Sequence, residues 1–319
     1  MSQGKLGVVT VTYNSSKFLD EFVASCNRQK LREFRVYSID NNSPDDTADH
    51  LLRISDARWY VSINSDNRGV AAANNQGIVQ ALRDGCDWIL LLNNDTSFDE
   101  NFFSTLLSEC VTNSGVVAVP KIYFDEPKGQ IWYGGGGFRP LKGYTGYHSA
   151  MGEMDVGQCD QHRTVEYAPT CAMILHRSVF EDIGLMDETY FIYFDDTDFC
   201  WRLKRAGIQI AYTPATTLIH KVGGSTGGDR KPFTVSYTSR NRLYYLRKNF
   251  GAVSALAWRP FFLMVYLYRY LSGWWDYSCL TAALRGSFSY GRMRPSVPKL
   301  TKDLQKGRDW LCPGLTSGG

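Results

Sequence analysis

Three clusters of acidic and amide side chains in this sequence could carry out chemistry. They are Asp40; the group Asn93, Asn94 and Asp95; and the group Asp195, Asp196 and Asp198. An acid at the end of a strand can accept hydrogen bonds from a nucleoside. Carboxylates also bind divalent cations and take protons from reacting hydroxyls. The three clusters could therefore bind a nucleotide, bind a metal ion and act as a general base.

The second cluster stands at the tip of an apolar run. The stretch "DWILLLNNDTS" (87–97) ends its apolar part in two amides and a carboxylate. Such a tip can bind Mg²⁺ or Mn²⁺ through Asp95, with a ligand's diphosphate completing the coordination shell. An Asx turn would use the same residues, so the motif alone leaves both interpretations open. His220 follows another apolar run and is predicted to face the same edge, where a neutral imidazole suits Mn²⁺.

The third cluster places three acids within four residues. Like charges repel at short range, so grouping three carboxylates is unfavourable unless they have a structural or functional role. A helix predicted over residues 194–207 can use one or two of them in its first turn, which is the structural alternative. The surplus indicates a general base whose pKa is tuned by its neighbours. Together with a metal site, such a base suits the transfer of a sugar from a nucleoside diphosphate, because the metal neutralises the leaving diphosphate.

The first part of the chain alternates predicted strands and helices. Buried strands are predicted over residues 6–12, 34–40, 58–64 and 87–93, and helices over 14–29 and 67–85. This order predicts an α/β fold with a doubly wound, mostly parallel sheet. Ligands bind outside the carboxyl ends of the strands in such sheets. Both Asp40 and Asp95 lie at such ends.

The middle of the chain is less regular. A strand is predicted over 116–124, a long loop or hairpin over the glycine-rich stretch 132–149, and a strand followed by a short helix over 166–184. A final pair of strands is predicted over 208–221. The glycine-rich stretch 222–228 is predicted to be flexible.

The C-terminal part of the chain is basic and aromatic. Residues 1–235 carry 22 Lys and Arg against 29 Asp and Glu, whereas residues 236–319 carry 13 against 3. Arg259, Pro260 and Arg269 interrupt the apolar stretches, which are too short to span a membrane. A pair of amphipathic helices on an anionic membrane surface fits better, with Trp258, Trp274 and Trp275 at the depth of the headgroups. The alternative is that these aromatic residues complete the core or a dimer.

Cysteine usage bears on the compartment. The eight cysteines are scattered and form no Cys-x-x-Cys pair. This spacing argues against a zinc site and favours reduced, structural thiols in the cytoplasm.

Several motifs resemble those of the family 2 glycosyltransferases, which have the GT-A fold and invert the sugar's anomeric centre. The opening "VVTVTYNS", the turn "IDNNSPDDT", the helix start "NRGVAAANNQGI", "LLNNDT", and the stretches "GLMDETYFIYFDDTDFCWRLKRAG" and "LIHKVGGST" carry the resemblance, which covers roughly residues 6–250. Within the family, the chain looks most like bacterial rhamnosyltransferases and next like galactofuranosyltransferases. Asn93 stands where the family commonly has the first acid of a DxD motif.

The resemblance implies a role for each matching position. Asp196 would be the base, and Asp95 with His220 would bind Mn²⁺ or Mg²⁺. The nucleotide and donor sugar would be bound by Thr10, Thr12, Tyr13, Asp40, Asn42, Asn67, Gly69, Asn75 and Asn94. The acceptor region would include Asp195, Asp198 and Trp201.

The resemblance also implies an activity, partners and a domain organisation. A GT-A domain is expected over 1–235, with a nucleotide-binding half to about 115 and an acceptor half from about 116, and a helical, basic extension over 236–319. The expected enzyme moves L-rhamnose from dTDP-L-rhamnose onto a saccharide or lipid-linked glycan in cell-surface polysaccharide synthesis. It would lie in the cytoplasm, peripheral on the inner face of the cytoplasmic membrane, with no nucleic-acid partner.

Three alternatives remain open at this point. A UDP-sugar could replace dTDP-rhamnose as the donor. A nucleotidyltransferase fits poorly, because "YNSSKFLDE" after the first strand lacks the glycines of a phosphate-binding loop. A non-catalytic subunit of a polysaccharide assembly would be expected to lack the base.

Overall fold

The first part of the chain folds as the alternating pattern predicts. The structure, a computed structural model, describes residues 4–112, 115–221 and 230–300. In chain order the elements are β1 (Leu6–Thr12), α1 (Ser16–Asn27), β2 (Phe34–Asp40), α2 (Thr47–Leu52), β3 (Trp59–Ile63), α3 (Val70–Arg83) and β4 (Trp88–Leu92). The β-branched run of β1 is buried on both sides, because helices cover both faces of the sheet.

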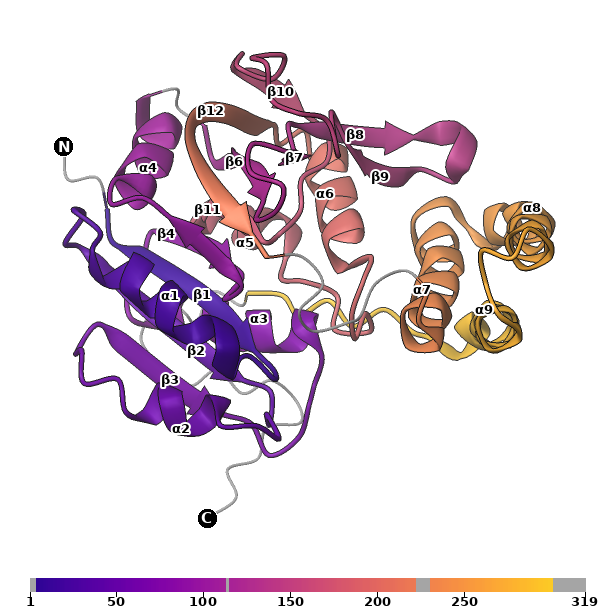
Figure 1. Cartoon of the computed structure of the whole chain (residues 1–319), viewed down its shortest axis with the longest axis horizontal. Helices are drawn as coiled ribbons and strands as arrows, with labels where there is room; N and C mark the ends of the chain where they lie inside the picture. The colour runs from indigo at the N-terminus through magenta and orange to yellow at the C-terminus, as the bar shows by residue number, and fades with distance from the viewer. Residues whose placement is uncertain (1–3, 113–114, 222–229, 301–319) are drawn as a thin grey trace.

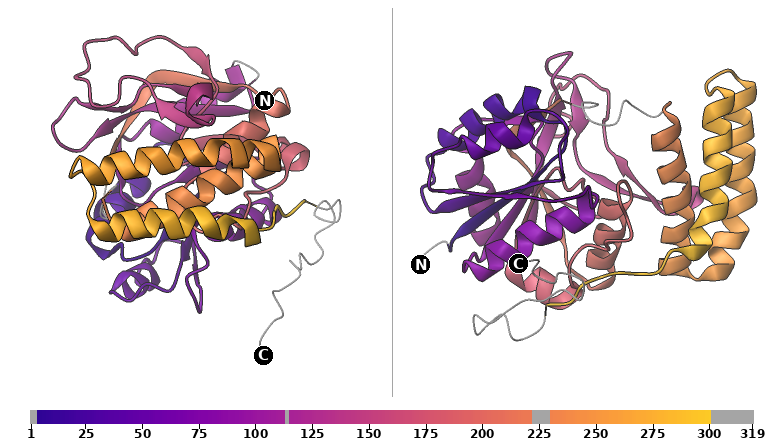
Figure 2. Two further views of the ribbon diagram at one scale, coloured as in Figure 1. Left: turned by 90° about the vertical axis from the view of Figure 1, so that its right-hand side faces the viewer. Right: turned by 90° about the horizontal axis from the view of Figure 1, so that it is seen from below.

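These four strands form one parallel block of a larger sheet. The order is β3-β2-β1-β4, with Val8 of β1 paired to Val36 on one side and to Leu90 on the other. Right-handed crossovers place α1 on one face and α3 on the other (Figures 1 and 2). The helix α3 packs closely on β1 because Gly77 has no side chain. A Cβ at Gly77 would overlap the side chain of Val9. The carboxyl ends of β1, β2 and β4 therefore meet at one edge.

The second part of the chain extends the sheet with strands of both directions. Its elements are β5 (Thr96–Phe98), α4 (Phe102–Thr112), β6 (Val117–Phe124), β7 (Ile131–Tyr133), β8 (Gly136–Arg139), η1 (Pro140–Lys142), β9 (Thr145–His148), β10 (Arg163–Val165), β11 (Ala172–His176), α5 (Arg177–Ile183), α6 (Asp195–Arg205) and β12 (Ile210–His220). The strand β11 runs antiparallel to β4, and β6 and β12 complete the mixed sheet. The sheet is mainly parallel, as expected.

Two local expectations are resolved by the structure. The glycine-rich stretch 132–149 contains a hairpin of β8 and β9, with η1 at its tip. The expected pair of strands over 208–221 is wrong, because one long strand, β12, runs through the region. Its register against β6 shifts between Thr213 and Thr217, so an irregularity at 214–216 interrupts the pairing without dividing the strand. The flexible stretch predicted over 222–228 lies outside the described residues.

The described C-terminal residues form three helices, of which the first two cover the stretch where the sequence predicts an amphipathic pair. They are α7 (Pro232–Phe250), α8 (Ala252–Leu271) and α9 (Tyr277–Ser289), followed by a short turn η2 (Tyr290–Arg292). The expected domain boundary at 235–236 falls inside α7, and residues 301–319 lie outside the description. The three helices stand together on one side of the sheet domain (Figure 2).

A buried ion-pair cluster joins α7 to the sheet domain. The Lys248 ammonium lies 2.7 Å from the carboxylates of both Asp187 and Asp198, whose side chains are 0% exposed. The chain after α9 returns to the same place, where the Ser296 amide donates to Asp187. The helices are thus attached at two points along the chain.

The described residues contain no helix long and apolar enough to cross a membrane. They contain seven cysteines, all of which are free and buried. Cys312 lies outside the described residues.

Candidate active site

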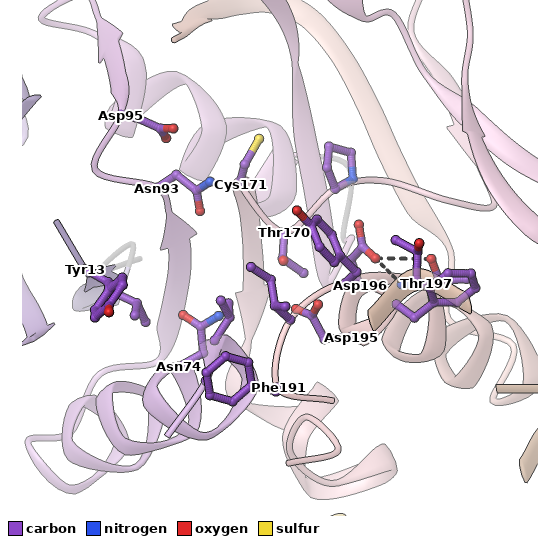
Figure 3. Close-up of a pocket in the computed structure, with 18 of the residues that line it drawn as sticks. Tyr13, Asn74, Asn93, Asp95, Thr170, Cys171, Phe191, Asp195, Asp196 and Thr197 are labelled. Atoms are coloured by element: carbon purple, nitrogen blue, oxygen red, sulfur yellow. Dashed lines mark hydrogen bonds between the residues drawn. The ribbon is translucent and has the colours of Figure 1, made fainter. Parts of the chain in front are cut away.

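A cavity of about 630 Å³ opens at the carboxyl ends of the central strands. Its walls come from the ends of β1 and β4, the start of α3, the loop before α6, the hairpin and α7. This volume suits a ligand of nucleotide-sugar size. Figure 3 shows Tyr13, Asn93 and Asp95 on one side of the cavity and Asp195 and Asp196 on the other. The cavity therefore brings all three chemical clusters, or their immediate neighbours, to one place.

On the first side, the residues expected to bind the nucleotide split into two groups. Tyr13, Asn67, Gly69 and Asn94 line the cavity. Thr10, Thr12 and Asp40 are buried and do not line it. The Asp40 carboxylate accepts hydrogen bonds from the Thr12 hydroxyl at 2.8 Å and from the Ser43 amide at 2.9 Å and hydroxyl at 2.6 Å. It holds the turn after β2 in place behind the cavity wall.

At two expected positions the neighbouring asparagine lines the cavity instead. Asn42 is exposed with a φ of 61°, and Asn41 faces the cavity while donating to the Gly69 carbonyl. Asn75 is buried and bonds both the amide and the carbonyl of Met186. Asn74 faces the cavity next to Phe191 (Figure 3) and makes no side-chain hydrogen bond to the described part of the chain. Its amide is therefore available to a ligand.

Gly69 joins the nucleotide side to the loop before α6. Its φ of 83° suits glycine. A Cβ there would overlap the Phe191 backbone, and the next amide, Val70, donates to the Phe191 carbonyl at 2.7 Å. The glycine of the "N-x-G" motif is thus required by a contact made between segments more than 120 residues apart.

Asp95 and His220 form the pair expected to hold a metal ion. Asp95 Oδ1 lies 3.2 Å from His220 Nε2, because β5 and β12 pair Thr96 with His220. Two ligands of one divalent cation, each about 2.1 Å away, lie about 3 Å apart, so the pair fits this role. The described residues hold no group of three or more His, Cys, Asp or Glu suited to a metal ion. The remaining ligands would have to come from a bound diphosphate and water.

On the opposite side, Asp196 is held by hydrogen bonds that leave it facing the cavity. Oδ2 accepts from the Tyr167 hydroxyl at 2.6 Å, and Oδ1 accepts from the Thr197 amide at 2.6 Å. Asp196 is the second residue of α6 and lies in its first turn. Oδ1 also accepts from the Thr197 hydroxyl at 3.1 Å. The second lone pair of Oδ2 is left to accept a proton from a bound hydroxyl.

Asp195 lies beside it and also lines the cavity. Burial, and then the neighbouring charge of Asp196, raises the pKa of Asp195 to about 7. A carboxyl group with a raised pKa in a cleft is a sign of a functional site, and Asp195 carries that sign directly beside Asp196.

The raised pKa of Asp195 predicts a pH-dependent cost to stability. A raised acid pKa favours the folded state below the unfolded value near 4, and this advantage is lost as the pH rises towards 7. Asp195→Asn should therefore stabilise the protein relative to wild type at pH 8 more than at pH 5, by roughly 1–4 kcal/mol. Thermal denaturation of both proteins at the two pH values measures this. A stability difference that does not change with pH would contradict it.

Two residues expected in the acceptor region lie outside the cavity. Asp198 is fully buried and binds Lys248, Arg202 and the Asn249 amide, so it attaches α7 rather than contacting an acceptor. Trp201 packs its ring against Phe138, Tyr144 and Phe250. Both are on the faces of α6 that turn towards the hairpin and the C-terminal helices.

Among the cavity residues that sequence patterns missed, two have side chains of chemical interest. Tyr167, which binds Asp196, carries no motif of its own. Arg242 projects from α7, and its side chain lies over the ring of Phe262 at 4.7 Å. It forms no ion pair within the described chain, and its Nε is buried without a partner. Only the packing of α7 against the loop before α6 brings this cation to the cavity.

Cys171 also lines the cavity. Burial raises the pKa of its thiol well above the ordinary value. The thiol is thus neutral at physiological pH, which argues against a nucleophilic role.

The fold and the position of the cavity define the class of protein. A mainly parallel α/β sheet has a cavity at the carboxyl ends of its central strands. The structure of GalNAc-T7 with UDP, GalNAc and Mn²⁺ matches 76% of this chain and 50% of that one, with a TM-score of 0.57 and 15% identity. The S. aureus TarS 1–349 structure with UDP-GlcNAc matches 77% and 67%, with a TM-score of 0.53 and 16% identity. These likenesses establish the GT-A fold.

The sequence identifies the family. The pattern of "Glycosyl transferase family 2" matches residues 7–184, and the chain belongs to this family. Over 219 residues it is 27% identical to a pre-mycofactocin glycosyltransferase of Mycobacterium tuberculosis, covering 67% of this chain but only 42% of that protein. It is 26% identical over 244 residues to the N-acetylglucosaminyl-diphospho-decaprenol L-rhamnosyltransferase of M. tuberculosis, covering 70% and 78%. It is 25% identical over 250 residues to the dTDP-rhamnosyl transferase RfbF of Shigella flexneri, covering 76% and 79%.

Proposed function

We propose that the protein is an inverting, metal-dependent glycosyltransferase that moves L-rhamnose from dTDP-L-rhamnose onto a saccharide or lipid-linked saccharide. Its place would be the synthesis of a cell-surface polysaccharide. The observation that carries this proposal is one cavity with the Asp95–His220 pair on one side and the Asp195–Asp196 pair on the other. A sugar bound between them would have its leaving group at the metal pair and its anomeric carbon towards the base.

The reaction follows from this layout. The acceptor hydroxyl forms a bond to the anomeric carbon as the bond from that carbon to the diphosphate oxygen breaks, and Asp196 takes the hydroxyl proton. Mn²⁺ or Mg²⁺ held by Asp95 and His220 would neutralise the negative charge on the departing diphosphate. The hydrogen bonds from Tyr167 and Thr197 hold Asp196 in one orientation during the transfer.

Two observations support the choice of donor and acceptor. Two of the relatives carry a rhamnosyltransferase name, and one of them acts on a diphospho-decaprenol saccharide. Arg242 offers to the cavity a cation that forms no ion pair with any described residue, which suits a phosphate in an acceptor of that kind. A UDP-sugar donor, for galactofuranose or another hexose, is the second candidate. An acceptor anchored in lipid would place the enzyme on the inner face of the cytoplasmic membrane.

Nucleotide binding tests the donor site directly. Calorimetric titration with dTDP, UDP and GDP, with and without Mn²⁺, is expected to show binding of dTDP that Mn²⁺ strengthens at least tenfold. Asp95→Ala should lose this dependence on Mn²⁺, because a single histidine remains to hold the ion. Asp49→Ala is the matched control, since Asp49 is an exposed acid on α2.

The outcomes separate the candidates. Preference for UDP would replace rhamnose with galactofuranose or another hexose. Binding that does not respond to Mn²⁺ in either protein would remove the metal from the proposal. If no nucleotide bound under any condition, a non-catalytic role in a polysaccharide assembly would become the better interpretation.

A further inference from the structure

The outer face of helix α8 is apolar although it faces solvent. The inner face packs on α7 and α9 through Ala255, Phe262 and Tyr266, which are buried. The three helices project from the sheet domain, with α8 and α9 on the side away from it (Figure 2). No other part of the described chain covers the outer face of α8.

The exposed residues of this face form one continuous stripe. They follow helical spacing and are 50–80% exposed, namely Val253, Leu256, Met264, Leu267, Tyr268 and Leu271. No charged residue interrupts them. A helix with apolar residues on both its inner and its outer face normally buries both, so the outer stripe of α8 is suited to a partner.

The charges around the stripe indicate what that partner is. Residues 232–299 contain ten Lys and Arg but one acid, Asp276. Three of the arginines at the helical unit lie over aromatic rings rather than beside carboxylates: Arg259 over Phe288 at 3.8 Å, Arg269 over Trp275 at 4.9 Å and Arg230 over Trp274 at 3.7 Å. Aromatic rings with arginines at their faces and an apolar stripe between them are typical of helices that lie in a membrane interface.

We propose that the outer face of α8 docks on an anionic lipid bilayer, with the helix lying in the plane of the membrane surface. The stripe would enter the boundary between headgroups and acyl chains, and the surrounding arginines would bind acidic headgroups. A second copy of this chain fits the stripe less well, because pairing two such units would bring two strongly basic surfaces together.

Of the three tryptophans expected at headgroup depth, only Trp274 is exposed enough to lie there. Trp274 is exposed beside the end of α8, whereas Trp275 is buried in the core of the helical unit. Trp258 is half-buried and stacks on Phe262. In the proposed docking, the apolar residues of the stripe contact the lipid in place of Trp258 and Trp275.

The docking face lies beside one wall of the cavity. The tip of the β8–β9 hairpin touches α8, where a Cβ on Gly143 would contact Phe262 at 3.0 Å. The same hairpin contributes Thr145 and Gly146 to the cavity, and Leu141 at its tip is 87% exposed. If the proposed transfer is correct, this arrangement would hold the acceptor side of the cavity close to a lipid-anchored saccharide.

Vesicle co-sedimentation of the full chain tests the docking face without any catalysis. Vesicles of phosphatidylcholine with 30% phosphatidylglycerol are compared with phosphatidylcholine alone. The wild type should bind the anionic vesicles more tightly, and 0.5 M NaCl should weaken that binding. Met264→Glu and Leu267→Glu should each reduce binding about tenfold, because each removes apolar burial and adds a negative charge. Leu52→Glu on α2 is the matched control, since Leu52 is as exposed as Met264 (66% and 64%).

Each outcome decides the proposal. Loss of binding in both α8 variants but not in the control, with unchanged thermal stability and dTDP binding, supports it. Equal binding of neutral and anionic vesicles, or no binding by the wild type, overturns it. Sedimentation equilibrium that shows a dimer broken by Met264→Glu overturns it in favour of a second copy. Because dTDP binding is measured separately, failure of the docking face is distinguished from failure of the donor site.

Discussion

Replacement of Asp196 by Asn is expected to lower kcat for sugar transfer by about 10²–10⁴-fold, because the variant keeps the shape of the side chain but cannot accept the proton of the acceptor hydroxyl. Asp196 is oriented towards the cavity by Tyr167 and Thr197, and an amide can preserve the bond from Tyr167. The donor site lies across the cavity and should be untouched (Figure 3). The measurement is a steady-state transfer assay paired with a calorimetric titration of dTDP.

Asp195→Asn is the matched comparison for this prediction. It lies next to Asp196 in the same turn and also lines the cavity, so it tests whether position alone explains the loss. We expect it to reduce kcat by less than Asp196→Asn and to alter the pH profile, since the charge of Asp195 titrates near neutrality. The reverse ranking would make Asp195 the base. Full activity in both variants would refute a carboxylate base at this turn.

Replacement of Lys248 by Met should give the largest loss of stability. Its ammonium neutralises two fully buried carboxylates, those of Asp187 and Asp198. Removing one partner of a buried ion pair leaves an uncompensated charge, which costs about 3–5 kcal/mol. Urea denaturation at pH 7 measures the free energy of unfolding. Lys204→Met is the control, because Lys204 pairs with Glu166 at an exposed site and should cost about 1 kcal/mol or less.

The same cluster predicts a change in the response to acid. Burial alone would raise the pKa of Asp187, but the charge of Lys248 and the hydrogen bonds around it lower that pKa below its ordinary value. The wild type therefore gains stability above the unfolded pKa near 4 and loses it as the pH falls through the lowered value. In Lys248→Met the deficit relative to wild type should shrink on acidification. A deficit that grows below pH 4 would contradict this assignment.

Local patterns were sufficient for the order of elements in the first part of the chain and for the chemical clusters. Residue type and spacing alone indicate three of the elements: β1 from its β-branched run, β4 from its apolar run, and α6 from the acids in its first turn and the bases in its last. The parallel sheet then places strand ends at one edge, which is why Asp95 and the Asp195–Asp196 turn could be assigned to one site. The pairing of Asp95 with His220 agrees with that prediction.

Contacts between distant segments decided the details. Whether Asn74 or Asn75 faces the cavity depends on the bonds of Asn75 to Met186, 111 residues away. The same holds for Asp198, which the sequence places near an acceptor but Lys248 draws into a buried cluster. Adjacent residues of one type have the same local propensity, so only the tertiary partner selects between them.

The sequence by itself indicated an α/β fold with a mostly parallel sheet, because this depends on short-range periodicity and on strand order. Its motifs, through their resemblance to family 2 glycosyltransferases, indicated the GT-A class, the candidate base and the candidate metal pair. Only the tertiary structure decided that Tyr167 supports Asp196, that Arg242 reaches the cavity and that α8 has an apolar face that no described residue covers. The physical reason is that each of these depends on how separate elements pack, and packing energy is set by surfaces that are far apart in the chain.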